Sequence, residues 1–376
     1  MSQADDRVKR ILDYLEARID LEHTQKVAER HRASLDFQPV DHLPLVIYLP
    51  YESDMFDMYP YPEAFHDPAK MMVNELLRNN RSSIFHQVDF QDDAPLCLRP
   101  NIGCTLITSM LGAQVKVVDN AMPWVLPLDD KTALMAVADG PLPPFDDGLL
   151  PRVIEQYDYF HSMLEDYPNC QTAIQVVLPD LQGPFNNVEM LWGSSIYLAF
   201  YDDNDRALML GLLSIVTDLT LAVYERLERE APNNIGCDYQ YQHTTAQKGR
   251  LMLRNDSSTN MSPLHYEEFI RPFDARIADA IGCIGIHSCG NVERLFAMWS
   301  SMRGVQCLDV GQPEKNDLDA LYAIAAETHI PLTRLVLPAA ELKADQLLAR
   351  FPTGVSLFHG AETLAEAGRV WQAYIG

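Results

Sequence analysis

The sequence predicts an α/β protein, built as a (β/α)8 TIM barrel with an N-terminal helical extension. Over the C-terminal half, short apolar runs alternate regularly with segments of helical periodicity. Apolar runs without inside–outside alternation are typical of parallel strands that helices cover on both faces. About eight such runs can be placed, which favours a closed barrel over an open doubly wound sheet. The open sheet is the alternative, but no Gly-x-Gly-x-x-Gly fingerprint supports a dinucleotide site in it.

The predicted strands are runs of apolar and β-branched residues that end in polar residues, proline or glycine. They are expected at 43–49, 83–90, 172–178, 234–238, 284–287, 305–309, 331–337 and 355–358. The helices between them show apolar residues at helical spacing. They are expected at 67–81, 151–166, 204–230, 262–280, 291–302, 317–328, 341–350 and 362–374. The clearest start signal is Ser262 followed by Pro263, a helix N-cap with proline at the first helical position.

Two segments fall outside this alternation. Residues 5–33 contain no proline or glycine and predict one helix, so we expect a helical extension over 1–34 and the barrel over 35–376. Residues 92–150 are irregular and rich in proline. We therefore expect them to form an insertion, or lid, over the barrel mouth.

Composition limits the possible partners and the cellular setting. The chain has 376 residues, of which 47% are hydrophobic, and a formal net charge of -24. That charge argues against nucleic acid or an anionic membrane as a partner. No uninterrupted apolar run reaches the length of a membrane span. The seven cysteines form no Cys-x-x-Cys pair and the N-terminus does not resemble a signal peptide, so we expect a reducing, cytoplasmic protein.

Polar residues follow nearly every predicted strand, where TIM barrels carry their active sites. They are Tyr48, Asp89, Gln182, Asp238 with Gln240 and Tyr241, His287 with Cys289, Asp309, Arg334 and His359. Asp309 can instead cap the following helix, and a lone histidine such as His359 is commonly a hydrogen-bonded loop residue. His287 and Cys289 differ because residues two apart on a strand point the same way. Imidazole and thiolate together are typical zinc ligands.

Three segments resemble the uroporphyrinogen decarboxylase superfamily, from about residue 35 to the C-terminus. They are His287-Ser288-Cys289-Gly290-Asn291, Gln182-Gly183-Pro184-Phe185 with its long following helix, and Asp256 followed by Ser262 to Pro272. The resemblance implies a (β/α)8 barrel. It also implies one of two activities, porphyrinogen decarboxylation or zinc-dependent methyl transfer between a corrinoid and an acceptor.

The N-terminal part of the barrel separates these two branches. True decarboxylases resemble one another in closely spaced arginines that hold the substrate carboxylates, whereas this chain has Leu45 to Glu52 there and no arginine. The methyltransferase branch shares the His-x-Cys pair as zinc ligands, with a further cysteine near the last strand. This chain has His359 near that position, which makes His359 the candidate third ligand. Glu362 is a weaker candidate, and Asp238 offers a carboxylate from strand four.

The leading hypothesis is a zinc methyltransferase whose partner is a methylcobamide, free or carried on a corrinoid protein. His287, Cys289 and His359 would bind the metal. Asp256, Asp238 and Asp89 are catalytic candidates. Substrate contacts are expected from Tyr48, Gln182, Gln240, Tyr241, Asp309 and Arg334. The alternatives are a metal-free decarboxylase or lyase acting on a small carboxylated substrate, and a barrel that binds a ligand without turning it over. A homodimer is the default expectation for such a barrel.

Overall fold

A seven-stranded parallel sheet forms the centre of the protein, so the predicted α/β class is confirmed. The computed structural model describes residues 2–49, 56–79, 91–128, 130–231, 238–242 and 245–376. The strands lie in the order β1 (Leu45–Tyr48), β13 (Val355–Gly360), β12 (Leu332–Val336), β11 (Val305–Val310), β10 (Ile284–Ser288), β9 (Leu251–Arg254) and β6 (Leu181–Gln182). Every adjacent pair in this sheet is parallel.

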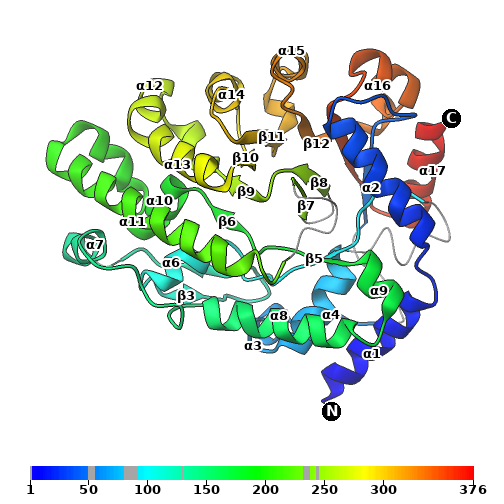
Figure 1. Cartoon of the computed structure of the whole chain (residues 1–376), viewed down its shortest axis with the longest axis horizontal. Coiled ribbons are helices and arrows are strands. Elements are labelled where there is room, and N and C mark those ends of the chain that lie inside the picture. The colour runs from blue at the N-terminus through cyan, green and yellow to red at the C-terminus, as the bar shows by residue number, and fades with distance from the viewer. Residues whose placement is uncertain (1, 50–55, 80–90, 129, 232–237, 243–244) are drawn as a thin grey trace.

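Helices surround the strands in the view of Figure 1. In the C-terminal half each strand leads into a helix, as expected for βα units. These helices are α14 (Glu293–Ser300), α15 (Leu318–Thr328), α16 (Ala344–Arg350) and α17 (Leu364–Ile375). The helix expected at 262–280 consists of α12 (Pro263–His265), a π-helical turn (Tyr266–Ile270) and α13 (Arg271–Ile281). The regular alternation predicted for this half is confirmed.

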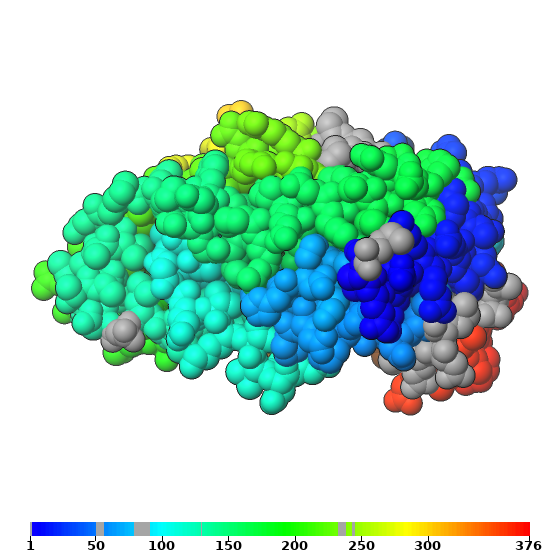
Figure 2. Space-filling view, turned by 90° about the horizontal axis from the view of Figure 1, so that it is seen from below, coloured from blue at the N-terminus to red at the C-terminus, as the bar shows by residue number. Residues whose placement is uncertain are grey.

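The remaining helices cover the N-terminal half. They are α3 (Tyr61–His66), α4 (Pro68–Asn79), α6 (Leu106–Met110), α7 (Lys131–Ala138), α8 (Leu150–Leu164), α9 (Pro168–Ala173), α10 (Pro184–Trp192), a 3-10 helix over Ser194–Tyr201 and α11 (Asp203–Leu227). Figure 2 shows one face of the molecule, on which α1, α4 and α8 lie side by side.

The N-terminal extension is two helices, whereas one was predicted. α1 (Gln3–Glu16) and α2 (Leu21–Leu35) are separated by a short turn. Asp20 makes the break because its carboxylate accepts a hydrogen bond from the backbone N–H of His23 and so caps the second helix. Proline and glycine are therefore not required to end a helix here.

The main sheet contains a strand that was not predicted, β9, which lies between β6 and β10. Residues 232–237 lie outside the described part of the chain, as does the strand predicted at 83–90. Between residues 232–237 and β9, the chain forms an antiparallel hairpin of β7 (Tyr239–Gln242) and β8 (Thr245–Lys248). Strand β8 contacts β10, β11 and β12, so the hairpin packs against the main sheet.

Two further two-stranded sheets come from the first half of the chain. β2 (Cys97–Leu98) and β5 (Gln175–Val176) pair in parallel, and β3 (Val115–Lys116) and β4 (Trp124–Val125) form an antiparallel hairpin. The segment 92–150 thus contributes a core strand as well as a hairpin and helices. Among the described residues, backbone hydrogen bonds do not close the main sheet into a barrel.

Helix α11 is long and apolar enough to cross a membrane by length and composition alone. However, 56% of its most apolar window is buried inside the protein, where it packs against α7, α10 and α13. This burial is what a core helix of a soluble protein requires.

Two buried aspartate side chains lie along the edge of β1 that pairs with no other strand among the described residues. The backbone N–H groups of Leu45 and Ile47 donate to Asp93 and Asp92, respectively. Asp93 also accepts from Arg30 on α2 and lies 3.2 Å from the His42 ring. These contacts fasten the N-terminal extension to the sheet.

Burial raises the pKa of Asp92 to about 8, against the opposing hydrogen bond from Ile47. Between pH about 4 and 8 the folded protein therefore holds a proton that the unfolded chain, with an Asp pKa near 3.9, releases. Stability should fall as pH rises through this window. In Asp92→Asn the oxygen still accepts from Ile47, but no proton is lost. Urea unfolding from pH 5 to 9 should show a shallower decline in the variant, by up to about 1.4 kcal/mol per pH unit. Equal slopes would mean that Asp92 is ionised in the folded protein.

Candidate metal and substrate site

A row of polar side chains crosses five adjacent strands. Gln182 on β6 is in register with Arg254 on β9, which is in register with His287 on β10. His287 is in register with Asp309 on β11, and Asp309 with Thr333 on β12. Registered residues of a parallel sheet project to the same face, so apolar strands bring these polar groups together.

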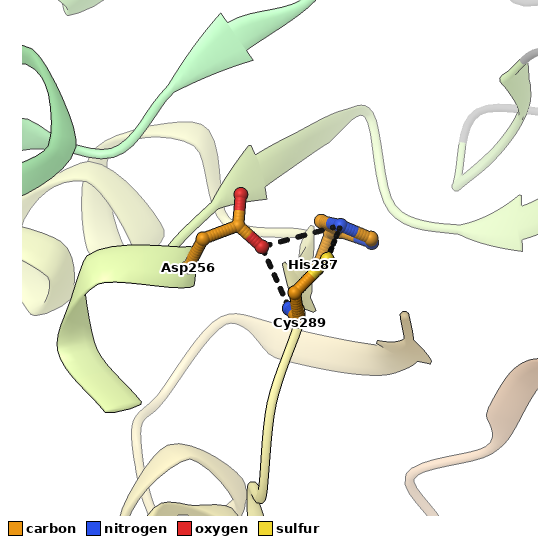
Figure 3. A group of neighbouring side chains, drawn as sticks. All are labelled: Asp256, His287 and Cys289. Carbon is orange, nitrogen blue, oxygen red and sulfur yellow. Dashed lines mark hydrogen bonds and ion pairs between the residues drawn. The ribbon is translucent and has the colours of Figure 1, made fainter. Parts of the chain in front are cut away.

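Asp256, His287 and Cys289 form a compact cluster (Figure 3) in which one potential metal-binding atom of each lies within 4.8 Å of the others. His287 Nε2 lies 3.7 Å from Cys289 Sγ and 3.4 Å from Asp256 Oδ1. The same Asp256 oxygen accepts a 2.6 Å hydrogen bond from the Cys289 backbone N–H. Strand β10 supplies His287, Cys289 is the first residue after that strand, and the 3-10 turn after β9 supplies Asp256.

The other nitrogen of the His287 ring, Nδ1, is hydrogen-bonded to Asp309. Nδ1 lies 2.9 Å from Asp309 Oδ2, whose second oxygen accepts from Arg334 Nε at the same distance. Gln247 of the β7–β8 hairpin also donates to Asp309. With Nδ1–H donating to the carboxylate, Nε2 is left to face Asp256 and Cys289. A histidine oriented in this way is the usual arrangement of a metal-binding imidazole.

Arg334 reaches Asp309 from an unusual backbone conformation. Its φ is +61°, in the left-handed region, and the pairing of β12 with β13 shifts register between Leu332 and Leu335. Such irregularities change the direction in which a side chain leaves the sheet. For a non-glycine residue the left-handed conformation costs about 1–2 kcal/mol. The Arg334 side chain keeps 30% of its surface exposed, so the guanidinium can still meet a ligand.

The cluster has the electrostatics of a cation site. Burial alone would lower the pKa of His287, but Asp309 and then Asp256 outweigh it and raise the pKa to about 10. Burial opposes the ionisation of Asp256 as well, yet the neighbouring His287 holds its pKa at about 2. Two ionised carboxylates therefore flank one imidazole. A divalent cation at Nε2 would replace the proton there.

If the cluster holds a zinc ion, Asp309→Asn should weaken its binding about 10- to 100-fold, although Asp309 is not one of the three donors. An asparagine cannot accept from both His287 and Arg334 through separate oxygens, so the imidazole loses its orienting partner. The measurement is zinc affinity by competition with a chromophoric chelator. Asp319→Asn, at a surface ion pair with Arg350, is the matched control and should bind zinc as the wild type does. Equal affinity in both variants would contradict an orienting role for Asp309.

A cavity of about 390 Å³ opens beside the cluster. The residues that line it are Cys104, Trp124, Pro127, Gln182, Asn186, Glu189, Met190, Gly193, Ser194, Asp256 and Ser257. Asp256 therefore belongs to both the cluster and the cavity. Gln182 is held there by Asn186, whose own oxygen accepts from the backbone of Ser257. The segment 92–150 reaches this cavity through Trp124 and Pro127.

The structure brings together some of the predicted residues and separates others. Asp256, His287, Cys289, Asp309, Arg334 and, through the cavity, Gln182 lie together at the carboxyl ends of the strands. The third donor beside His287 and Cys289 is Asp256. His359 lies on β13, three strands from β10, and is not in the cluster.

Asp238 lies at the opposite end of the sheet. Its carboxylate is 3.6 Å from Arg250, and its backbone carbonyl accepts from Cys283; these two residues precede β9 and β10. Its expected catalytic place at a strand's carboxyl end is therefore wrong, because the hairpin separates it from that end.

The remaining predicted contacts also lie elsewhere or outside the described residues. Tyr241 is buried in a small apolar cluster with Leu35 and Val177, and Gln240 is its neighbour within the β7–β8 hairpin. Tyr48, at the end of β1, stacks on Phe358 of β13. Asp89 lies outside the described part of the chain.

Sequence reasoning missed the residues that reach the site from outside the main sheet. Gln247 comes from a hairpin with no predicted role, and Trp124 and Glu189 come from β4 and α10. No spacing signal connects these positions to His287. Asn186 was within reach of prediction because it follows the Gln182-Gly183-Pro184 segment by one helical turn.

Comparison of the chain with known families and proteins adds no further identification. No family profile matches the sequence, and no curated protein is significantly similar to it. The resemblance to the uroporphyrinogen decarboxylase superfamily therefore stays a prediction from the quoted segments.

Proposed function

We propose that the protein is a zinc-dependent methyltransferase that moves a methyl group to or from a corrinoid. The observation that carries this proposal is the cluster of Asp256, His287 and Cys289, which offers oxygen, nitrogen and sulfur donors to one point. These are the ligand types of catalytic zinc sites, which use three protein ligands and leave a fourth position open.

The separations of the donor atoms fit zinc. Bonds of about 2.1 Å to nitrogen, 2.3 Å to sulfur and 2.0 Å to oxygen at tetrahedral angles separate nitrogen from sulfur by about 3.6 Å and nitrogen from oxygen by about 3.4 Å. In the structure Nε2 is 3.7 Å from Sγ and 3.4 Å from Oδ1. When bound, zinc would act as a Lewis acid that lowers the pKa of an acceptor such as a thiol.

The residues around the cluster supply orientation and charge balance. Asp309 and Arg334 fix the imidazole of His287 so that Nε2 faces the open side. Thiolate and carboxylate together neutralise a divalent ion, which leaves the site without excess charge. The side chain of Asp256 is 38% exposed and that of His287 only 4%, so a substrate would approach past Asp256.

We further propose that the strands complete an eight-stranded barrel. Two observations support it, because both bring the small β2–β5 sheet close to the two edges of the main sheet. Asp92 and Asp93, just before β2, bind the backbone of the edge strand β1. The other edge strand, β6, follows β5 after only a few residues.

We also propose that the protein works in a reducing, cytoplasmic setting. This proposal is supported by the described cysteines, none of which is in a disulfide.

The test is zinc content followed by methyl transfer from methylcobalamin to a simple thiol, 2-mercaptoethanol. Zinc-loaded protein should bind about one zinc per chain and accelerate the loss of the methylcobalamin spectrum under anaerobic conditions. Metal-stripped protein should not, and zinc should restore the rate. Activity that is unchanged by stripping would overturn the proposal.

One observation favours the metal-free decarboxylase as a second candidate. Arg334 is partly exposed beside the cluster and could hold a substrate carboxylate. Arg254 offers a second guanidinium, but its side chain is only 11% exposed and is bound to Asp180. A decarboxylase of this kind would work in the presence of a chelator and fail as Arg334→Gln.

A further inference from the structure

The cavity beside Asp256 carries negative charge on the wall formed by α10. Its lining contains two carboxylates, and no lysine or arginine is among its described lining residues. The Asp256 carboxylate faces the His287 ring at 3.4 Å, so the charge that a ligand would meet away from the donor cluster is that of Glu189. An anionic ligand would meet repulsion in this cavity, and a cationic one would be attracted.

An aromatic surface lies on the same cavity wall. Trp124 on β4 is 62% exposed, although the next residue, Val125, is buried. An indole is the best aromatic face for an organic cation, and the combination of an aromatic ring with a carboxylate recognises ammonium groups. Met190 and Pro127 add apolar surface suited to methyl or methylene groups.

Glu189 is placed to act as the anionic partner. It projects from α10 into the cavity lining, near the hydroxyl of Tyr197. Burial and, less strongly, the charge of Glu189 raise the pKa of Tyr197 to about 12, so this tyrosine stays neutral beside the carboxylate. The chain's net charge of -24 favours the approach of cations in general.

We propose that this cavity binds a small organic ammonium ion, with the charged group held by Glu189 and the Trp124 ring and the other end directed to Asp256. The identification of this ion as the substrate of methyl transfer rests on the proposed function; the binding itself does not. A cavity of about 390 Å³ lies at the small end of ligand sites, which suits an ion of this size.

The test compares choline with its uncharged carbon isostere, 3,3-dimethylbutan-1-ol, by calorimetric or NMR titration of the protein as purified. Choline should bind at least 10-fold more tightly than the isostere. Glu189→Gln and Trp124→Ala should each weaken choline binding at least 10-fold and leave binding of the isostere within about 3-fold. Trp124→Phe should retain part of the affinity, which shows that the ring face matters. Glu155→Gln, an exposed carboxylate on α8, is the control and should bind choline as the wild type does.

The result that would overturn the inference is equal binding of choline and the isostere, or no effect of Glu189→Gln on choline. Zinc content is measured in every variant, because neither Glu189 nor Trp124 belongs to the donor cluster and both variants should keep the metal. Choline binding without methyl transfer would support the inference and count against the proposed function. Methyl transfer without selective choline binding would support the proposed function and overturn the inference.

Discussion

If the proposed zinc site exists, we expect Cys289→Ser, His287→Ala and Asp256→Asn each to abolish zinc binding and, with it, methyl transfer. Each change removes one of the three donors, and the distances of His287 Nε2 from the other two match a tetrahedral site. Loss of a direct ligand should weaken zinc binding by more than about 100-fold, the upper end of what loss of an orienting partner costs. Zinc per chain by elemental analysis and affinity by chelator competition measure this directly.

Two control variants make the result specific. Cys283→Ser changes the cysteine that precedes the same strand, at the opposite end of β10, and should keep the metal. His359→Ala should also keep it, because the structure places this histidine outside the cluster. If His359→Ala lost zinc and Asp256→Asn kept it, the ligands would be His287, Cys289 and His359, as the sequence indicated, and not the cluster with Asp256. Zinc retained in all three cluster variants would exclude a metal site at this position.

Stability provides a second measurement of the same site. A ligand that binds only the folded protein raises the unfolding free energy by an amount that grows with its concentration relative to its dissociation constant. Chelation should therefore lower the melting temperature of the wild-type protein and leave that of Cys289→Ser unchanged. This readout does not depend on knowing the substrate.

The C-terminal strands were predictable because burial on both faces leaves a plain signature. Strands such as β11 and β12 are covered by helices, so apolar residues outnumber polar ones in them, although Asp309 and Arg334 interrupt the runs. The hairpin before β9 was not predicted, because β7 and β8 consist mostly of polar residues although they are buried. Hydrophobic periodicity cannot identify buried strands that are made of polar residues.

The candidate site was predictable only where it depends on strand position. His287, Cys289, Asp309 and Arg334 follow from strand ends, and Asp256 from the quoted resemblance. That Asp256 lies beside His287 depends on the register of β9 with β10, which pairs His287 with Arg254. Register between strands is set by packing and hydrogen bonding and leaves no mark in residue spacing. His359 was expected close by because the resemblance implies a third ligand near the last strand.

Gly183→Ala should disturb both stability and zinc binding, although residue 183 binds nothing itself. Gly183 lies where β6 leads into α10, and an added Cβ would overlap the Asn255 side-chain oxygen. Asn255 cannot easily move aside, because its backbone N–H donates to the His287 carbonyl and its amide to Asp274. Overpacking of this kind costs about 1–3 kcal/mol. Urea unfolding measures that loss, and Gly360→Ala, with open space around the new Cβ, is the matched control.

The displaced residue precedes Asp256, so the strain should also reach the donor cluster. We expect Gly183→Ala to weaken zinc binding and Asn255→Ala to relieve the overlap. The combined cost of the two changes should then be smaller than the sum of the single costs, which a double-mutant cycle measures. Additive costs would place the disturbance elsewhere. Sub-additive costs with a recovered zinc affinity would show that close packing of β6 against the β9 turn holds Asp256 at the cluster.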